Sequence, residues 1–284
     1  MDKHQEAKYK NNVPVVELID AELRYGDRRL WSNLNLKIMP GEFIAILGPN
    51  GSGKTSLLRV LLGLNELSNG SVKVNGEAPR KGSNKIGYVP QQKAFDKDLP
   101  IRGRDLVRLG LDGHRYGITL TSSLTKQLVQ DVLEGAGATE FADSPIGLLS
   151  GGEQQRLCIA QALIGNPAVL LCDEPLLSLD IAHQQIISQL IDERRREHDT
   201  AVLFVTHEIN PILSLVDKVV YLVDGKWAIG KPEDVMTSEK LSELYGTSVE
   251  VIKVKERIIV VGSDDASITE PLEHHHAHIE GKSR

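Results

Sequence analysis

Apolar residues along this chain recur in two patterns, which predict two kinds of element. Short runs rich in branched aliphatic residues occur at 43–47, 85–89, 169–172, 202–206 and 219–223. Longer stretches of helical period separate them, with apolar residues at Leu57, Leu58, Leu61 and Leu62 and at Ile186, Ile187, Leu190 and Ile191. Strands that alternate with helices in this way predict an α/β fold with a parallel sheet at its core.

Alternating apolar and polar residues predict two smaller β-structures outside that core. Segments 15–24, 34–38 and 71–75 alternate in the manner of antiparallel strands and predict a small β-layer. Segments 249–254 and 258–261 flank three charged residues and predict a C-terminal β-hairpin. From residue 263 onward there is no apolar period, so we expect a disordered tail over 263–284.

The strand pattern lapses between residues 92 and 149. In this region one helical face carries apolar residues at Leu124, Leu128, Val129, Val132 and Leu133. We interpret residues 98–146 as a helical insertion in the core, extending to about residue 168 with the helix that follows. The chain then divides into one domain, residues 13–262, and the tail.

Composition narrows the class of protein. The 284 residues amount to about two average domains, or to one large α/β domain with appendages. A hydrophobic share of 40% and a charged share of 25% exclude a disordered, collagen-like or disulfide-framework chain. With 33 basic against 39 acidic residues, the formal charge of -6 gives no general attraction to nucleic acid or anionic membranes, and we expect no nucleic-acid partner.

Targeting signals are missing from the sequence given. The longest apolar runs have five residues, whereas a membrane-spanning helix needs about 20. The first twelve residues carry charge but no apolar stretch, so we expect no secretory signal and a cytoplasmic location. Cys158 and Cys172 lie in apolar segments, which favours buried, reduced thiols.

A phosphate-binding loop follows the first predicted core strand. The sequence GPNGSGKT matches the G-x-x-x-x-G-K-[ST] pattern between a strand and an apolar-periodic helix. Glycines let backbone N–H groups converge on phosphate oxygens, and the helix N-terminus adds the positive end of its dipole. Lys54 is expected to contact the β- and γ-phosphates, and Thr55 to ligate Mg²⁺. The candidate ATP-binding residues here are Gly48, Pro49, Asn50, Gly51, Ser52, Gly53, Lys54, Thr55 and Ser56.

Two adjacent carboxylates end another predicted strand, in the sequence AVLLCDEP. Asp173 and Glu174 repel each other there unless a cation or a proton offsets their charge, and Mg²⁺ held beside ATP supplies that charge. Asp173 is then the metal carboxylate, and Glu174 is placed to polarise an attacking water as general base. A solvated acidic turn is the alternative.

The segment LSGGEQQR, residues 149–156, discriminates among ATP-binding proteins. Taken alone, Ser150 to Glu153 form a capping box, which is a common helix start. The two glycines at that start, Gly151 and Gly152, leave backbone N–H groups open to a phosphate.

In these motifs the chain resembles the ATP-binding subunits of ABC transporters. LSGGEQQR matches the signature of that family and lies between the phosphate loop and AVLLCDEP, as in the family; the resemblance covers about residues 13–235. It implies a P-loop NTPase core with a parallel sheet, an antiparallel β-layer and a helical insertion, and an enzyme that hydrolyses ATP with Mg²⁺.

The resemblance also assigns roles to four further residues. Gln91 in YVPQ resembles the glutamine that ligates Mg²⁺ or holds water, although Gln92 fits equally well by spacing. Asp180 in SLD resembles the D-loop aspartate, and His207 in FVTHE resembles the switch histidine that contacts the γ-phosphate. Tyr25 in LRYG resembles the residue that stacks on adenine. A lone histidine is otherwise more often structural, and Tyr25 can merely pack.

The partners implied by the resemblance follow from the signature. In the family, Ser150, Gly151, Gly152 and Glu153 of one subunit would close over ATP held by a second copy, giving a head-to-tail homodimer. Integral membrane permease subunits, an extracytoplasmic substrate-binding protein and a place on the inner face of the cell membrane are implied as well. Residues 93–111 are the expected docking surface for the permease, and YVPQQ with the LPI that follows looks like the zinc/manganese-type metal importers.

The tail carries the one substrate hint that does not come from the resemblance. His274, His275, His276 and His278 lie within five residues, and imidazole clusters suit Zn²⁺, Ni²⁺ or Co²⁺. A solvated tail without a role, or a sequence resembling a purification tag, are the alternatives. Two further alternatives stay open: transport of another substrate, and a soluble ABC ATPase that acts on ribosomes or DNA. Proteins of the second kind usually have two fused nucleotide domains or a long coiled-coil insertion, and this sequence shows neither.

Overall fold

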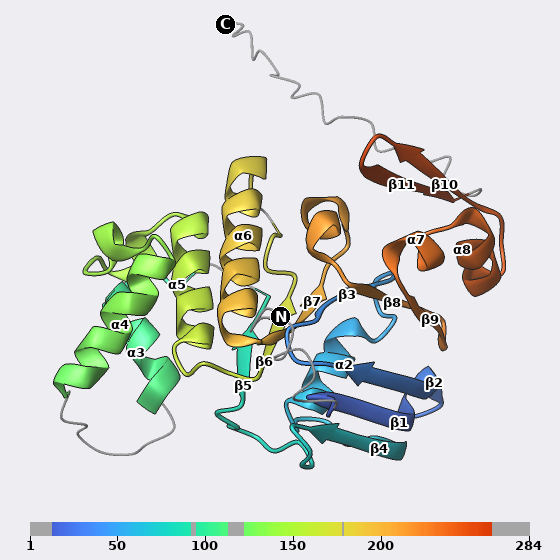
Figure 1. Cartoon of the computed structure of the whole chain (residues 1–284), viewed down its shortest axis with the longest axis horizontal. Helices are drawn as coiled ribbons and strands as arrows, with labels where there is room; N and C mark the ends of the chain where they lie inside the picture. The colour runs from blue at the N-terminus through green and yellow to red at the C-terminus, as the bar shows by residue number, and fades with distance from the viewer. Residues whose placement is uncertain (1–12, 92–94, 113–121, 178, 263–284) are drawn as a thin grey trace, which may run out of the picture.

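The central sheet has six strands in the order β5-β6-β7-β3-β8-β9 (Figure 1). The computed structural model describes residues 13–91, 95–112, 122–177 and 179–262. The first five strands of the sheet are parallel and β9 runs antiparallel to β8. The strands are β3 (Phe43–Leu47), β5 (Ile86–Val89), β6 (Val169–Asp173), β7 (Ala201–Val205), β8 (Lys218–Val223) and β9 (Lys226–Gly230). The predicted parallel core is therefore confirmed.

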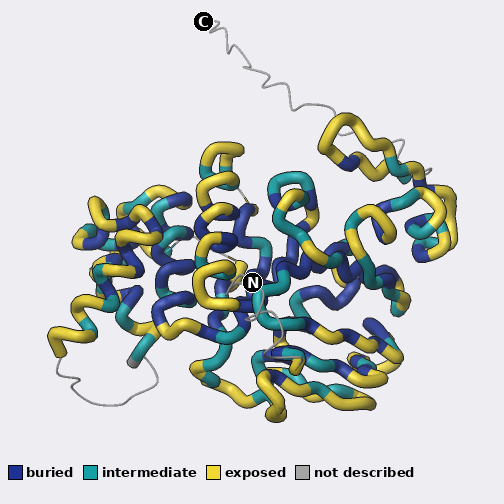
Figure 2. The backbone as a smooth tube through the Cα atoms, viewed as in Figure 1, coloured by how far each residue is buried: buried dark blue, intermediate teal, exposed yellow. Residues whose placement is uncertain are grey.

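Both faces of this sheet are covered, which explains why its strands read as continuous apolar runs. All five residues of β3 are buried. Phe43, Ala45 and Leu47 belong to one hydrophobic cluster, whereas Ile44 and Ile46 belong to a second cluster on the opposite face. Figure 2 shows the central strands as the buried middle of the molecule.

The helices divide between the two faces. Helix α2 (Lys54–Leu61) packs in the cluster that also contains the antiparallel layer, and the helical insertion and α6 (Ile181–His198) pack in the other cluster. The insertion consists of α3 (Gly103–Asp112), α4 (Ser123–Gly135) and α5 (Gly151–Leu163), with α3 and α4 lying beyond α5 from the sheet (Figure 1).

One residue of the predicted helical face in the insertion is misplaced. Val129, Val132 and Leu133 of α4 are buried, but Leu124 is 68% exposed. The helix packs through its second half, so an apolar residue in its first turn extends past the contact. The prediction that Leu124 shares the packed face was therefore wrong.

The two smaller β-structures have the predicted pairing. β1 (Val16–Tyr25) lies between β2 (Arg28–Ile38) and β4 (Asn69–Val74) in an antiparallel sheet. β10 (Val249–Val254) and β11 (Arg257–Gly262) form the C-terminal hairpin, which follows the short helices α7 (Pro232–Val235) and α8 (Ser238–Tyr245). The predicted tail, including its four histidines, lies outside the described residues.

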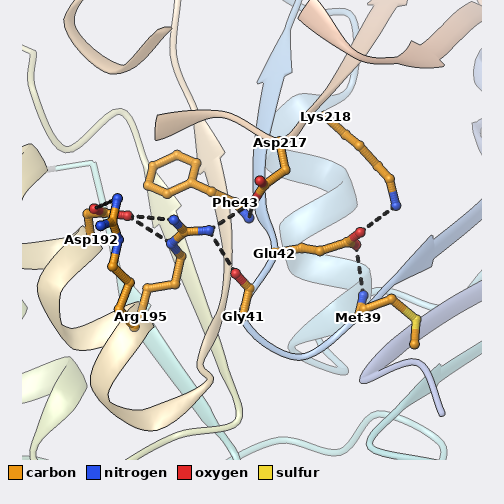
Figure 3. A network of polar contacts seen from close by, with 9 residues as sticks. Met39, Gly41, Glu42, Phe43, Asp192, Arg195, Asp217 and Lys218 are labelled. Atoms are coloured by element: carbon orange, nitrogen blue, oxygen red, sulfur yellow. Dashed lines mark hydrogen bonds and ion pairs between the residues drawn. The ribbon is translucent and has the colours of Figure 1, made fainter. Parts of the chain in front are cut away.

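A polar network fastens the end of β3 that lies away from the phosphate loop (Figure 3). Arg195 in the last turns of α6 donates to the carbonyl oxygen of Gly41 and to Asp217, each at 2.8 Å, and bonds Asp192 through its Nε at 2.8 Å. Asp217 also accepts from the backbone N–H of Phe43 at 2.8 Å. The guanidinium lies 5.9 Å from the centre of the Phe43 ring. This network ties α6, β3 and the start of β8 together.

Within the described ranges, no helix is both long enough and apolar enough to cross a membrane.

Candidate functional site

The phosphate loop joins β3 directly to α2, and two of its glycines are required by close contacts. Gly48 has φ +138°, and a Cβ there would lie 2.0 Å from the carbonyl oxygen of Leu222. Gly53, with φ +99°, would bring a Cβ to 2.9 Å from the indole nitrogen of Trp31. The loop is thus held close against its neighbours, and the N–H groups in the first turn of α2, which have no partner within the helix, face the loop.

Lys54 folds back over this loop. Its Nζ donates to the carbonyl oxygens of Gly48 at 2.7 Å and Pro49 at 3.0 Å. Burial lowers the pKa of Lys54, while the charges of Glu174 and Asp173 act in the opposite direction. A phosphate in the loop would meet this ammonium together with the helix N-terminus.

Thr55 and Asp173 meet at the mouth of the loop. The Thr55 hydroxyl donates to Oδ1 of Asp173 at 3.1 Å. Asp173 is 3% exposed, and burial raises its pKa, with the Thr55 hydrogen bond opposing that shift. A hydroxyl and a buried carboxylate side by side are hard oxygen donors, the kind that Mg²⁺ takes in proteins.

The strand order brings three more predicted residues together. β5, β6 and β7 are neighbours, so the segments that follow their carboxyl ends lie side by side. Gln91 follows β5 and donates to Oε2 of Glu174 at 2.9 Å. His207, two residues after β7, forms an ion pair or hydrogen bond with Oε1 of Glu174. Both carboxylate oxygens of Glu174 are therefore engaged.

The backbone of Glu174 is unusual for a residue with a side chain. Its φ is +51°, in the left-handed region, and its N–H donates to the carbonyl oxygen of Val205 in β7 at 3.0 Å. Residues held in such conformations cost free energy and cluster at functional sites. Here the turn directs the Glu174 side chain, which is 12% exposed, toward Gln91 and His207.

Lys54, Thr55, Gln91, Glu174 and His207 line one cleft of about 720 Å³. Beside the phosphate loop it is bounded by Tyr25, Arg28, Gln91, Glu174, Leu177 and His207. Tyr25 is half exposed and accepts a hydrogen bond from Asn65, so it is available for stacking at the rim. Clefts outside the carboxyl ends of parallel strands are the usual ligand sites of open α/β sheets. Gln92, the alternative to Gln91, lies outside the described residues.

Arg28 was not identified from the sequence. Its Nη2 donates to the carbonyl oxygen of Gly51 at 3.0 Å, which places a cation at the edge of the cleft. The only signal for it is its place three residues after Tyr25, where β2 begins.

The signature segment has the predicted local structure. Ser150 caps α5: its backbone N–H donates to Glu153 at 2.8 Å, and its Oγ accepts from the N–H of Glu153 at 3.4 Å. The Ser150 hydroxyl also donates to Oε2 of Glu153 at 2.7 Å, and this bond, together with the one from the Ser150 backbone N–H, lowers the pKa of Glu153. A Cβ at Gly152 would lie 2.6 Å from the ring of His183, whereas Gly151 has nothing within 4 Å.

The signature does not reach the cleft of its own chain. None of Ser150, Gly151, Gly152 and Glu153 lines it, and neither does Asp180. Asp180 caps α6, accepting from the N–H of His183 at 2.9 Å and bonding the His183 ring at 2.8 Å, and these bonds lower its pKa. The structure thus brings most of the predicted ATP-site residues together and leaves the signature facing outward.

The structure describes only part of the expected docking surface for the permease. Residues 95–111 of the expected docking surface include most of α3, whereas Lys93 is outside the described residues. No group of three or more His, Cys, Asp and Glu residues that could hold a metal occurs in the described part of the chain. Cys158 and Cys172 are free and buried, as expected, and burial raises the pKa of Cys158 to about 11.

Comparison with known proteins places these features in a family. A family profile with the description "ABC transporter" matches residues 31–177. The "Manganese transport system ATP-binding protein MntB" of Halalkalibacterium halodurans is 34% identical over 248 residues, which are 87% of this chain and 98% of that relative.

Two solved structures are similar as well. One belongs to a metal-chelate type ABC transporter in an inward-facing conformation, with a TM-score of 0.74 and 26% identity over 87% of this chain and 96% of that one. The other is a dimeric ATP-binding cassette in a post-hydrolysis state with ADP and Pi, with a TM-score of 0.64 and 30% identity over 76% of this chain and 98% of that one.

Proposed function

The chain belongs to the ABC transporter family as an ATP-hydrolysing subunit, and from that premise we propose that it energises the import of a divalent transition metal, zinc or manganese, through a membrane permease. The relative named for manganese transport carries the proposal, because the alignment spans nearly its whole length. The similar structure of a metal-chelate type transporter supports a substrate that contains a metal.

Lys54 and the phosphate loop would hold the phosphates of ATP. The ammonium of Lys54 already lies against Gly48 and Pro49, so it can exchange a carbonyl partner for a phosphate oxygen without moving far. Tyr25 at the rim would stack on the adenine, and Arg28 adds a second cation beside Gly51.

Thr55, Asp173 and Gln91 are the residues that would hold Mg²⁺. Thr55 and Asp173 fit this role because their oxygens are 3.1 Å apart and a cation would offset the burial of the Asp173 charge. Bound there, Mg²⁺ would neutralise charge on the β- and γ-phosphates.

Glu174 would accept the proton of the attacking water. In this structure Gln91 and His207 each bond one of its two oxygens, which orients the carboxylate. We expect His207 to turn to the γ-phosphate when ATP is bound, which frees Oε1 of Glu174 for the proton.

A second copy of the chain would complete the site. The Ser150 cap leaves the N-terminus of α5 and the open position of Gly151 outside the cleft, so these groups would close over ATP that another subunit holds. The dimeric cassette among the similar structures supports such a pair. Loss of the γ-phosphate would remove these contacts and let the pair reopen.

The remaining partners are proposed from the family. The subunit would dock on integral membrane permease subunits at the inner face of the cell membrane, with residues 95–111 contributing the surface. An extracytoplasmic substrate-binding protein would deliver the metal to the permease. Substrate choice then rests with those partners.

Two measurements test the substrate. Co-purification from native membranes should recover a permease with this chain, and cells lacking the chain should contain less zinc or manganese. Wild-type chain should restore the metal content, and Glu174→Gln should not. Unchanged zinc and manganese in cells that lose uptake of another solute would overturn the metal proposal while leaving the ATPase assignment intact.

A further inference from the structure

Asn210 hydrogen-bonds the C-terminal hairpin to the segment that carries His207. Asn210 donates from Nδ2 to the carbonyl oxygen of Ile258 in β11 at 3.0 Å. The N–H of Ile258 donates back to Oδ1 of Asn210 at 2.8 Å. The amide of Asn210 thus pairs with both main-chain groups of one strand residue.

This pairing imitates a neighbouring strand. In an antiparallel pair, alternate residues turn their N–H and C=O groups away from the partner strand. Ile258 lies opposite Lys253 of β10 and presents its main-chain groups to Asn210 at the other edge. An asparagine suits this position because its amide offers one donor and one acceptor in a plane.

Little chain separates this pair from the ATP cleft. Residues 206–210, here called the switch segment, run from the end of β7 to Asn210. The segment starts in a tight turn, because the Thr206 hydroxyl donates to the carbonyl oxygen of Glu208 at 2.9 Å and accepts from its N–H at 3.2 Å. Ile209 is buried. Because this segment is short and constrained, a shift of Asn210 therefore also moves His207.

A cavity of about 550 Å³ separates the hairpin from the phosphate loop. Gly48, Pro49 and His207 line it on one side, and Val249, Ile258 and Val260 line it on the other. Hydrogen bonds from Val249 and Val251 of the hairpin go to α8 instead, at Ser242 and Ser238. The Asn210 pair therefore joins the hairpin to the switch segment at the border of this cavity, beside the buried apolar cluster that includes Ile209 and Ile258.

We propose that Asn210 is a positioning residue: together with the hairpin it holds the switch segment so that His207 reaches Glu174 and the γ-phosphate. The inference rests on the role proposed above for His207. It makes the rate of ATP hydrolysis depend on a hairpin that contributes no group to the ATP cleft. Through the hairpin, the C-terminal part of the chain can then regulate ATP hydrolysis.

The test compares four variants of the full chain with the wild type. Asn210→Ala removes the pair, and Ser242→Ala is the matched control, because Ser242 also makes two hydrogen bonds to the hairpin, both with Val249 and both on the α8 side. His207→Ala reports on the role of the histidine itself. Phosphate release gives kcat and KM for ATP, titration gives ADP affinity, and thermal unfolding gives the loss of stability.

Asn210→Ala should lower kcat about tenfold with unchanged ADP affinity, because a misplacement of about 1 Å at a reacting group costs up to 100-fold in rate and ADP has no γ-phosphate. Ser242→Ala should lose similar stability and retain kcat. Asn210→Asp keeps the acceptor but sets a carboxylate oxygen against the carbonyl oxygen of Ile258, so it should lower kcat at least as much as Asn210→Ala, and it replaces Asn210→Ala should that variant not fold.

Three outcomes would overturn the inference. A wild-type kcat in Asn210→Ala, with hydrolysis lost in His207→Ala, removes the positioning role and leaves the ATP site as proposed. An equal fall of kcat in Ser242→Ala shows general loosening of the hairpin. Wild-type hydrolysis by His207→Ala removes the histidine role itself, and the inference falls with it.

Discussion

Thr55 and Asp173, 118 positions apart in the sequence, are joined by a hydrogen bond of 3.1 Å between the first turn of α2 and the end of β6. This contact closes the phosphate loop against the strand that carries the two carboxylates. It also brings the candidate metal ligands to one edge of the cleft, next to Lys54 and Glu174.

Replacing Glu174 should separate ATP binding from hydrolysis. Glu174→Gln keeps the shape of the side chain and can still bond Gln91, but an amide cannot accept the proton of water, so kcat should fall about 100-fold or more. Nucleotide affinity should persist, and a stable dimer should form with ATP, visible by size-exclusion chromatography. Glu233→Gln, which changes an exposed acid in α7, is the control and should hydrolyse normally. Wild-type turnover by Glu174→Gln would remove Glu174 from the base role.

Replacing Lys54 should weaken ATP binding itself. Lys54→Ala removes the ammonium that lies over Gly48 and Pro49, so the phosphates lose a direct positive contact. Fluorescent-nucleotide titration should show lower affinity, whereas Lys37→Ala, an exposed lysine paired with Glu17, should bind as the wild type does. Retained affinity in Lys54→Ala would contradict the phosphate-loop assignment.

Mixing two defective subunits tests whether sites are shared between copies. Ser150→Arg should block the signature, and Lys54→Ala the phosphate loop, so each variant alone should be inactive. In a mixed dimer both lesions fall on one of the two sites and the other is intact, so mixing should restore part of the ATPase rate. The head-to-tail dimer fails as a description if both variants keep full activity and no dimer appears with ATP.

The Arg195 network should contribute to stability rather than to catalysis. The Arg195 side chain is 11% exposed, so Arg195→Ala leaves the carboxylate of Asp192 short of a buried partner and should cost about 3 kcal/mol in the free energy of unfolding. Arg196 also pairs with Asp192 at 2.8 Å but is 68% exposed, and Arg196→Ala should cost about 0.5 kcal/mol. Urea denaturation measures the free energy of unfolding of both variants. Equal losses would show that the stabilising effect of Arg195 does not depend on its burial.

The histidines of the tail should bind metal without affecting hydrolysis. Replacing His274, His275, His276 and His278 by alanine should lower Zn²⁺ or Ni²⁺ binding and leave the ATPase rate nearly unchanged, because the cluster is far in sequence from every phosphate-handling motif. Binding by the wild type should strengthen as pH rises through about 6.5, where the imidazoles lose their protons. Equal calorimetric titrations for both chains would leave the tail without this role.

Local pattern was enough to predict the parallel core strands and the phosphate loop, but not β9 or the short helices α7 and α8. A strand, a glycine-rich turn and a helix follow each other within residues 43–61, so their geometry depends on neighbours in the sequence, and the structure has them as predicted. The same holds for the Ser150 capping box and for the hairpin, in which all partners are close in the chain. Leu124 was misassigned because helical period marks a face but not how far along it the packing extends.

Only the tertiary structure decided which residues meet. The order β5-β6-β7-β3 places Gln91 and His207 on the two oxygens of Glu174, and strand order is set by packing across the whole sheet, not by the apolar pattern of any single strand. For the same reason, the sequence could not predict the contacts of Arg28 with Gly51, of Arg195 with the Phe43 ring, or of Asn210 with Ile258. Each is a polar side chain whose partner lies many residues away in the sequence. Such a contact produces no periodic pattern of residues, so the sequence does not indicate the partner.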